Sequence, residues 1–265
     1  MATGNSKMQM ETGVGWGRGF NNMFKGELKS WFGTRKWWTQ IIIWAAAINF
    51  IYLMVAISER KAPSSDQTLI FNIFMGLVGP IGASIIMQNT VVGEKKAGTA
   101  AWILSKPVTR ISFILSKLTA NTIGLAVTML AAQGFIAYLI TTFVMGITIP
   151  VPGFLGAMGV HLVHILFYIT LTLMLGTIFN HPAPVIGIPM AFFFFQSILP
   201  NFYPTALNVL PWVLALPWNN SPDPSMAFAL MDGVSVPTML PFYCTILAIA
   251  VFVTAAIWIF KRQEL

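Results

Sequence analysis

Residues 118–222 contain no Asp, Glu, Lys or Arg. A water-soluble domain of that length would need charged side chains to cover its surface. The rest of the composition points the same way, because 56% of the 265 residues are apolar, only 9% are charged and the mean hydropathy is +0.75. The sequence therefore predicts an all-α integral membrane protein, in which roughly 20 apolar residues make one crossing of the hydrocarbon layer.

Six segments have the length and apolar character of transmembrane helices. Six crossings place both ends of the chain on the same side of the membrane. The predicted organisation is an N-terminal region over residues 1–36, a six-helix transmembrane domain over 37–260 and a short tail over 261–265. The six predicted spans are residues 37–57, 69–92, 114–145, 157–179, 183–203 and 239–260.

The positions of the cations give the orientation, since Lys and Arg near span ends are retained on the cytoplasmic side. Only Arg60 and Lys61 fall on one side; the other 13 of the 15 cations fall on the opposite side. We therefore expect cytoplasmic termini in a prokaryotic plasma or inner membrane. The net charge of +7 follows from this topology and requires no nucleic-acid partner. The 13 cations are Lys7, Arg18, Lys25, Lys29, Arg35, Lys36, Lys95, Lys96, Lys106, Arg110, Lys117, Lys261 and Arg262.

The N-terminal region carries an amphipathic pattern. Apolar side chains recur at helical spacing at Phe20, Phe24, Leu28 and Trp31. This pattern favours a helix that lies in the headgroup layer. The alternative is a basic tail with scattered aromatic residues.

The stretch GEKKAGTAAWILSKPVTRISFILSK, residues 93–117, concentrates one acid and five cations between the second and third spans. Residues 94–104 have helix-forming composition, Pro107 breaks the pattern, and a second helix can start near Thr109. This predicts a helical elbow in the cytoplasm. Topology alone accounts for the cations, but the mixture of charged residues with Trp102 is typical of a protein docking surface.

Several residues of the elbow form a pattern that resembles the cytoplasmic loop of permease subunits in the type-2 class of ATP-binding-cassette (ABC) exporters. In that family the loop is the coupling helix. The layout is also similar: an interfacial helix, six spans, cytoplasmic termini and short outer helices between spans 5 and 6. The residues that carry the resemblance are Glu94, Gly98-Thr99, Leu104, Pro107-Val108-Thr109-Arg110 and Lys117.

The resemblance implies that the elbow contacts a nucleotide-binding ATPase subunit. It also implies a homodimer, or a pair with a related permease, in which spans 2 and 5 line the interface between the two permeases. The expected docking residues are Glu94, Lys95, Lys96, Gly98, Thr99, Leu104, Pro107 and Arg110. Close helix packing or kinks are expected at Gly76, Gly79, Pro80 and Gly82 in span 2 and at Gly187 and Pro189 in span 5.

The chain offers no ATP site of its own. Gly93 and Gly98 have the spacing of the two glycines in a phosphate loop, but Thr99 stands where the phosphate-binding Lys belongs. We therefore expect ATP and Mg on the partner subunit, no cofactor on this chain and no catalysis by this chain alone.

The segment between spans 5 and 6 is apolar but is interrupted by Pro211 and Pro217, so it is too short to cross. It predicts short re-entrant or interfacial helices on the outer face, with Trp212 and Trp218 at the headgroup level. We expect them to contribute to an outer gate; the alternative is a lid without a transport role.

The predicted spans contain polar residues but no ionisable acid or base at mid-membrane. Ion-coupled carriers usually need such groups, so an amphipathic or apolar cargo such as a lipid, drug or peptide is favoured. One alternative is a permease-like subunit that transmits ATPase force to other machinery without moving a solute. A remote alternative is an integral-membrane metalloenzyme that uses His161 and His164, whose spacing can hold a metal but lacks nearby ligands to complete a shell.

Overall fold

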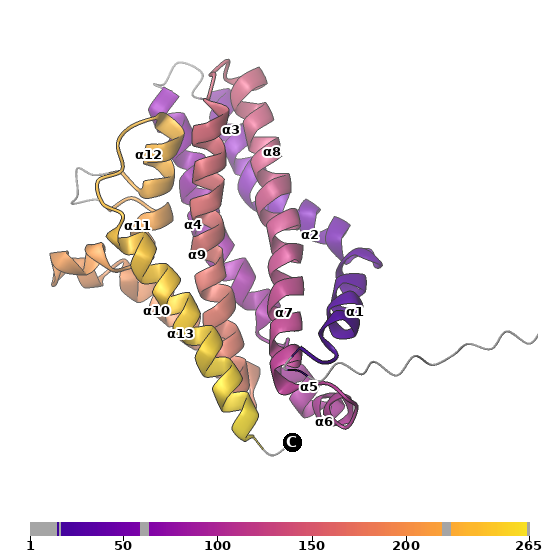
Figure 1. The fold of residues 1–265 in the computed structure, drawn as a ribbon. Coiled ribbons are helices and arrows are strands. Elements are labelled where there is room, and N and C mark those ends of the chain that lie inside the picture. Colours follow the sequence, from indigo (N-terminus) through magenta and orange to yellow (C-terminus); the bar gives the residue numbers. More distant parts are fainter. Residues whose placement is uncertain (1–14, 16, 59–63, 219–223, 264–265) are drawn as a thin grey trace, which may run out of the picture.

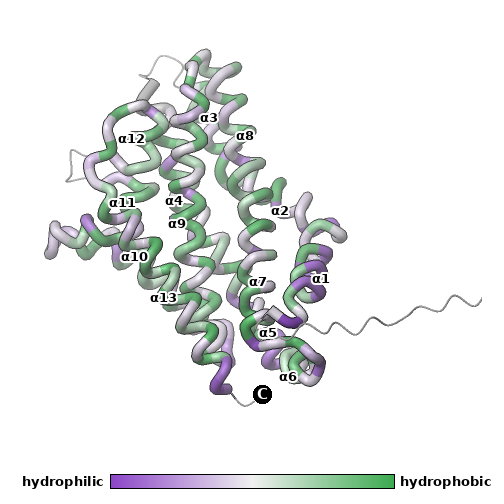
Figure 2. Tube along the Cα trace, in the orientation of Figure 1, coloured by the Kyte–Doolittle hydropathy of each residue, from purple (hydrophilic) through white to green (hydrophobic). Residues whose placement is uncertain are grey.

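The computed structural model describes residues 15, 17–58, 64–218 and 224–263. All regular secondary structure in these residues is helical. Six helical segments are long and apolar enough to cross a membrane, and Figure 2 shows that hydrophobic residues dominate them. Lys7, Arg60 and Lys61, which the charge pattern assigns to a side of the membrane, lie outside the described residues. The six candidate spans are Lys36–Ser58, Thr68–Lys96, Arg110–Val144, Val151–Ile178, Pro182–Asn201 and Leu240–Arg262.

The helices follow one another as a largely antiparallel bundle (Figure 1). The first half contains α1 (Phe20–Phe32), α2 (Lys36–Trp44), the π-helix η1 (Ala45–Asn49), α3 (Phe50–Ser58), α4 (Ser64–Met87), α5 (Val92–Lys96), α6 (Thr99–Leu104) and α7 (Arg110–Leu125). The π-helix η2 (Ala126–Ala131), α8 (Ala132–Leu139), the π-helix η3 (Ile140–Val144), α9 (Val151–Ile178) and α10 (Pro182–Gln196) follow. The 3₁₀ turns η4 (Leu199–Asn201) and η5 (Pro204–Asn208), then α11 (Trp212–Ala215), α12 (Met226–Asp232) and α13 (Leu240–Arg262), complete the fold.

Two helix ends differ from the sequence expectation, and proline accounts for both. α9 begins at Val151 instead of residue 157, with Pro152 in its first turn. A proline is tolerated there because the first N–H groups of a helix have no partner within it. α10 ends at Gln196 and gives way to η4, which contains Pro200. Pro200 has no N–H to continue the hydrogen-bond ladder.

The core is organised around α9, which packs against α4, α7, α10, α11, α12 and α13. It is the most buried of the candidate spans. The first and third spans pack together through α2, η1, η2 and α8. Helix α1 lies along α7 at the end of the bundle that also carries α5 and α6 (Figure 1).

A buried amide pair joins the first and third spans. Asn49 in η1 donates from Nδ2 to Oε1 of Gln133 at 2.7 Å. Gln133 in turn donates from Nε2 to the main-chain oxygens of Ile41 at 3.1 Å and Thr128 at 3.0 Å. A π-helix leaves main-chain groups free of their usual partners, and both side chains lie beside such segments. The pair therefore fixes the register of the two spans with uncharged groups.

The described ends of the chain lie close to the short helices α5 and α6. Figure 1 shows the end of α13 at the same end of the bundle as α5 and α6, while α12 lies at the opposite end. Polar residues gather at α1 and at the end of α13 (Figure 2). The layout therefore separates a polar end, which carries the elbow, from an end with short apolar helices.

Candidate functional site

The segment between α4 and α7 folds as two short helices that form an elbow, which we define as residues 92–110 and which ends at the first residue of α7. Gly98 separates α5 from α6 with a φ of +70°, a left-handed conformation that residues with a side chain rarely adopt. Pro107 follows α6, and Thr109 caps the start of α7 through its side-chain oxygen. The sequence therefore forms the elbow with one glycine turn, one proline and one helix cap.

Apolar side chains attach the inner face of the elbow to the bundle. Val92 and Ala100 are fully buried, and Ile103 and Leu104 pack half-buried against the main core. The main-chain N–H of Thr109 donates to the main-chain oxygen of Arg18 at 3.1 Å. The elbow is therefore part of the folded core.

Lys95 connects the elbow to the end of α9. Its Nζ donates to the main-chain oxygens of Gly176, Thr177 and Phe179 at 3.4, 2.9 and 3.0 Å. The last carbonyls of a helix have no partner within it and form the negative end of its dipole. Lys95 therefore caps α9 and directs its charge into the molecule.

Arg110 makes the equivalent contact with α13. Its Nη1 donates to the main-chain oxygens of Phe260, Lys261 and Gln263 at 2.9, 2.9 and 2.5 Å. The side-chain amide of Gln263 donates to the main-chain oxygen of Thr177, at the end of α9. The elbow, α9 and α13 are therefore joined at their ends by polar side chains.

An ion triad links the elbow to α1 and α7. Lys117 is only 2% exposed, and its Nζ lies 2.7 Å from Oε1 of Glu27 and 2.5 Å from Oε1 of Glu94. Oε2 of Glu94 is shielded from solvent and has no hydrogen-bond partner among the described residues. A buried cation is tolerated only when such pairing offsets its lost hydration. The triad therefore holds three helices together.

The outer face of the elbow carries an exposed aromatic ring. Trp102 is 61% exposed, and Nζ of Lys106 lies 3.4 Å from the centroid of its ring. This cation–π contact orients the ring without burying it. The exposed face of the elbow consists of Lys96, Ala97, Gly98, Thr99, Ala101, Trp102, Ser105, Lys106 and Pro107.

The expected docking residues divide into two groups. Lys96, Gly98, Thr99 and Pro107 lie on the exposed face. The side chains of Glu94, Lys95 and Arg110 make the internal contacts described above, and Leu104 is half-buried. The Trp102–Lys106 pair is absent from the expected set, although the four-residue spacing of an aromatic residue and a cation signals such a contact.

Close helix packing occurs at the glycines of α4. A Cβ atom on Gly76 would lie 3.0 Å from side chains of α11 and its following residue. On Gly79 it would lie 2.9 Å from Ile165, and on Gly82 it would lie 2.5 Å from Met129. At these distances an added side chain would require the neighbouring side chains to shift. These glycines therefore let α4 approach its neighbours closely.

The other positions where close packing or a kink was expected, Pro80, Gly187 and Pro189, have different surroundings. Pro80 lies inside α4 and Pro189 lies buried inside α10. A Cβ atom on Gly187 would meet nothing within 4 Å. The Gly187 side of α10 is therefore open in the single chain.

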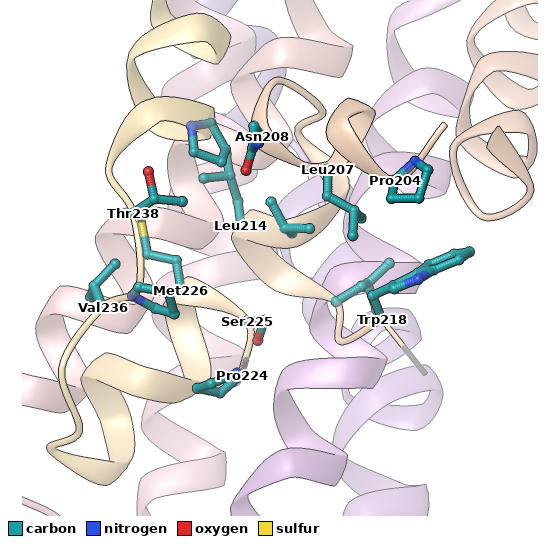
Figure 3. A pocket seen from close by; sticks show the side chains of 14 residues that line it. Pro204, Leu207, Asn208, Leu214, Trp218, Pro224, Ser225, Met226, Val236 and Thr238 are labelled. Atoms are coloured by element: carbon teal, nitrogen blue, oxygen red, sulfur yellow. The ribbon is translucent and has the colours of Figure 1, made fainter. Parts of the chain in front are cut away.

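Trp212 and Trp218 belong to one irregular region. Trp212 donates its Nε1–H to the main-chain oxygen of Pro217 at 3.2 Å, and its main-chain N–H donates to Oε1 of Gln196 at 3.1 Å. Trp218 lines a cavity of about 140 Å³ (Figure 3). The labelled side chains around that cavity are Pro204, Leu207, Asn208, Leu214, Trp218, Pro224, Ser225, Met226, Val236 and Thr238.

The two histidines of α9 are fully buried. His161 donates from Nε2 to Oδ1 of Asn72 at 2.9 Å, and Asn72 donates from Nδ2 to Sδ of Met231 at 3.2 Å. Neither ring nitrogen of His164 has a hydrogen-bond partner, and its ring lies edge-on to Tyr168. Among the described residues, no group of three His, Cys, Asp or Glu side chains could hold a metal. His161 thus joins α9 to α4 and α12.

A comparison with curated proteins found no match. A model of a protein family, described as "ABC-2 family transporter protein", matches residues 43–265. The match includes the elbow, the short helices α11 and α12 and nearly all of the six candidate spans. Members of this family are membrane components of ABC transporters that generally pair with an ATP-binding subunit and are generally not catalytic themselves. The chain therefore belongs to the ABC-2 transporter permease family.

Proposed function

We propose that the chain is the transmembrane permease subunit of an ABC exporter. It moves an amphipathic or apolar cargo out of the cytoplasm or the inner leaflet, and ATP hydrolysis on a separate subunit drives the movement. One observation carries this proposal. The exposed face around Trp102 belongs to an element whose other side chains, Lys95 and Arg110, hold the ends of α9 and α13.

The exposed face of the elbow is the proposed contact with the ATPase subunit. An exposed aromatic ring beside cations has the composition of an interface anchor. Lys96 and Lys106 provide positive charge that acidic residues of a partner can approach. Glu94, Lys95 and Arg110 contribute indirectly, because their contacts hold the elbow in place beneath that face.

The partner supplies ATP and Mg in this proposal. The elbow then lies in the cytoplasm of a prokaryotic cell, and the N-terminal region over residues 1–36 contributes the interfacial helix α1. The end of α13 lies at the same end of the bundle as the elbow (Figure 1), which is consistent with cytoplasmic termini and a cytoplasmic tail over residues 261–265.

The transport pathway lies between two copies of the chain, or between this chain and a related permease. The open side of α10 at Gly187 supports this arrangement, because a second subunit can approach there. The buried Asn49–Gln133 pair between the first and third spans is made by uncharged side chains, which favours an amphipathic or apolar cargo. Trp212 and Trp218 contribute to an outer gate in this proposal.

The test is co-purification of the full chain with ATP-binding-cassette ATPase subunits of the same cell, followed by ATPase measurements in nanodiscs. We expect Trp102→Ala to weaken association by at least about 10-fold, as is typical of an interface anchor. Trp38→Ala is the matched control, because Trp38 is 56% exposed but lies on α2. If the chain still associates with the ATPase subunit in both Trp102→Ala and Lys96→Glu, the elbow is not part of the contact.

A transport assay separates the exporter from a subunit that only transmits force. The reconstituted complex is supplied with ATP, and fluorescent lipids, drugs and apolar peptides are followed across the vesicle membrane. ATP-dependent movement that stops in the Trp102→Ala complex supports the exporter. ATPase activity without movement of any of these cargo classes favours force transmission to other machinery.

A further inference from the structure

A polar cavity of about 290 Å³ lies between α1, α4, α5 and α7 at the elbow end of the bundle. It is much larger than a single buried water requires. Its walls contain two acids, two lysines and several neutral polar groups. The lining residues are Glu27, Ser30, Trp31, Lys36, Ile86, Asn89, Thr90, Gly93, Glu94, Lys117 and Asn121.

The cavity lies at the level where candidate spans begin and end. Lys36 is the first residue of the first candidate span, and Ile86 lies in the last turn of α4. Trp37 and Trp38 follow Lys36, and Trp38 is exposed. Exposed tryptophans at a span end mark the headgroup layer of a bilayer. The cavity is therefore placed where lipid headgroups lie.

The charges in the cavity are not fully paired. Glu27, Glu94 and Lys117 form the triad, which has one carboxylate in excess. Nζ of Lys36 lies 4.0 Å from the centroid of the Trp31 ring. In the described part of the chain, no carboxylate lies within salt-bridge distance of this amine. Among the described residues, the cavity thus contains one ammonium without a direct carboxylate contact, that of Lys36, which Glu27 attracts electrostatically, and one carboxylate oxygen without a partner, Oε2 of Glu94.

The hydrogen-bonding groups of the cavity likewise include an acceptor and a donor that are not fully satisfied by the protein. Oε2 of Glu94 has no partner and needs a donor. Its carboxylate turns about a soft terminal torsion, so Oε2 can face the cavity. Lys36 brings three N–H donors from the neighbouring wall, and Ser30 and Asn89 are exposed polar residues of the lining. A ligand that carries both an anion and an N–H cation complements all of these groups with charge-assisted hydrogen bonds.

We propose that this cavity binds the headgroup of an aminophospholipid, phosphatidylethanolamine, from the leaflet on the elbow side. Its phosphate accepts hydrogen bonds from Lys36, Ser30 and Asn89. Its primary ammonium donates to Glu94. A choline headgroup has no N–H to donate, and Lys36 already covers the face of Trp31 on which a quaternary ammonium would stack. A glycerol headgroup has no cation for the carboxylates.

This site is separate from the exposed face of the elbow, and its occupation does not depend on an ATPase partner. The bound lipid touches α1, the start of α2 and α5, so it adds a bridge between the first helix and the elbow. Binding can therefore be measured on the purified chain by itself.

The test is native mass spectrometry of the full chain released from nanodiscs that contain equal amounts of phosphatidylethanolamine, phosphatidylcholine and phosphatidylglycerol. We expect retained phosphatidylethanolamine to exceed each of the others. Lys36→Met should lower its retention by about 10-fold, the effect of losing one charge-assisted hydrogen bond. Lys25→Met is the matched control, because Lys25 is exposed on α1 and lies outside the cavity lining.

A second experiment tests whether the cavity binds a membrane lipid or a soluble molecule with the same headgroup. Soluble phosphoethanolamine is added to the chain in detergent, and displacement of the retained lipid is followed. Displacement only at a large excess supports a lipid site. Equal retention of the three lipids, equal effects of Lys36→Met and Lys25→Met, or tight binding of phosphoethanolamine with no retained lipid would each overturn the proposal.

Discussion

Lys117 of α7 and Glu27 of α1 are separated by 90 residues, and their charged atoms lie 2.7 Å apart. Removing the cation leaves Glu27 and Glu94 without their partner. We expect Lys117→Met to lower the free energy of unfolding by about 3 kcal/mol, because an unpaired buried charge costs more than the pair contributes. Thermal unfolding in detergent, followed by tryptophan fluorescence, measures this effect.

Removal of all three charges provides the control for that prediction. The triple variant Glu27→Gln, Glu94→Gln, Lys117→Met leaves no unpaired charge, so it should be more stable than Lys117→Met alone. A triple variant that is less stable than Lys117→Met would contradict the explanation by unpaired carboxylates, because the two acids would then stabilise the fold without Lys117.

Lys95 and Lys96 are neighbours with opposite roles, and this makes them a matched pair. Lys95→Met removes three hydrogen bonds from the end of α9 and should cost about 1–3 kcal/mol of stability. Lys96 is exposed, so Lys96→Met should change stability by less than about 0.5 kcal/mol. Chemical or thermal unfolding of the chain alone distinguishes the two, and equal losses would contradict the assignment.

Arg110 holds the end of α13 through three carbonyls. In Arg110→Ala those carbonyls lose their partner, and we expect the last turn of α13 to fray. Hydrogen–deuterium exchange of the peptide that contains residues 256–263 should become faster. Lys261→Ala, which removes an exposed side chain of the same turn, should leave the exchange rate of that peptide unchanged. Unchanged exchange in Arg110→Ala would exclude its role as a cap.

Gly82 lies where three helices meet, because Trp44 and Met129 both fill the space that a Cβ atom would occupy. We expect Gly82→Ala to destabilise the fold by about 1–3 kcal/mol through overpacking. Gly159→Ala in α9 is the control, since nothing lies within 4 Å of its added Cβ atom. It should be neutral or slightly stabilising, because alanine is the better helix former. Thermal unfolding of both variants gives the comparison.

Much of the fold follows from local sequence signals. The uncharged run over residues 118–222 and the six apolar segments predict the six spans because hydropathy is a local property of about 20 residues. The break at Pro107 and the helix start near Thr109 were predictable for the same reason, since both residues act on the backbone at their own positions. The turn at Gly98, which divides the helical segment expected over residues 94–104 into α5 and α6, was not predicted. The helix ends near Pro152 and Pro200 were placed less accurately, because a proline permits a helix start as readily as it ends one.

The roles of individual charged residues were harder to predict from the sequence. Whether Lys95 or Lys96 faces the bundle depends on how a five-residue helix is rotated, and the end of α9 that receives Lys95 lies more than 80 residues away. The Glu27–Lys117 pair is equally distant in sequence. No local pattern encodes such contacts. The exposure of Trp102 likewise depends on which side of α6 meets the core.

The contacts of Lys95 and Arg110 with helix ends have a mechanical consequence. A helix resists stretching because every turn is bridged by hydrogen bonds parallel to its axis. A load applied to the last carbonyls of α9 therefore acts along its length, and 28 residues at 1.5 Å each carry that load over about 42 Å. The opposite end of α9 lies against α12, so a load on the elbow end of α9 is directed along the helix toward α12.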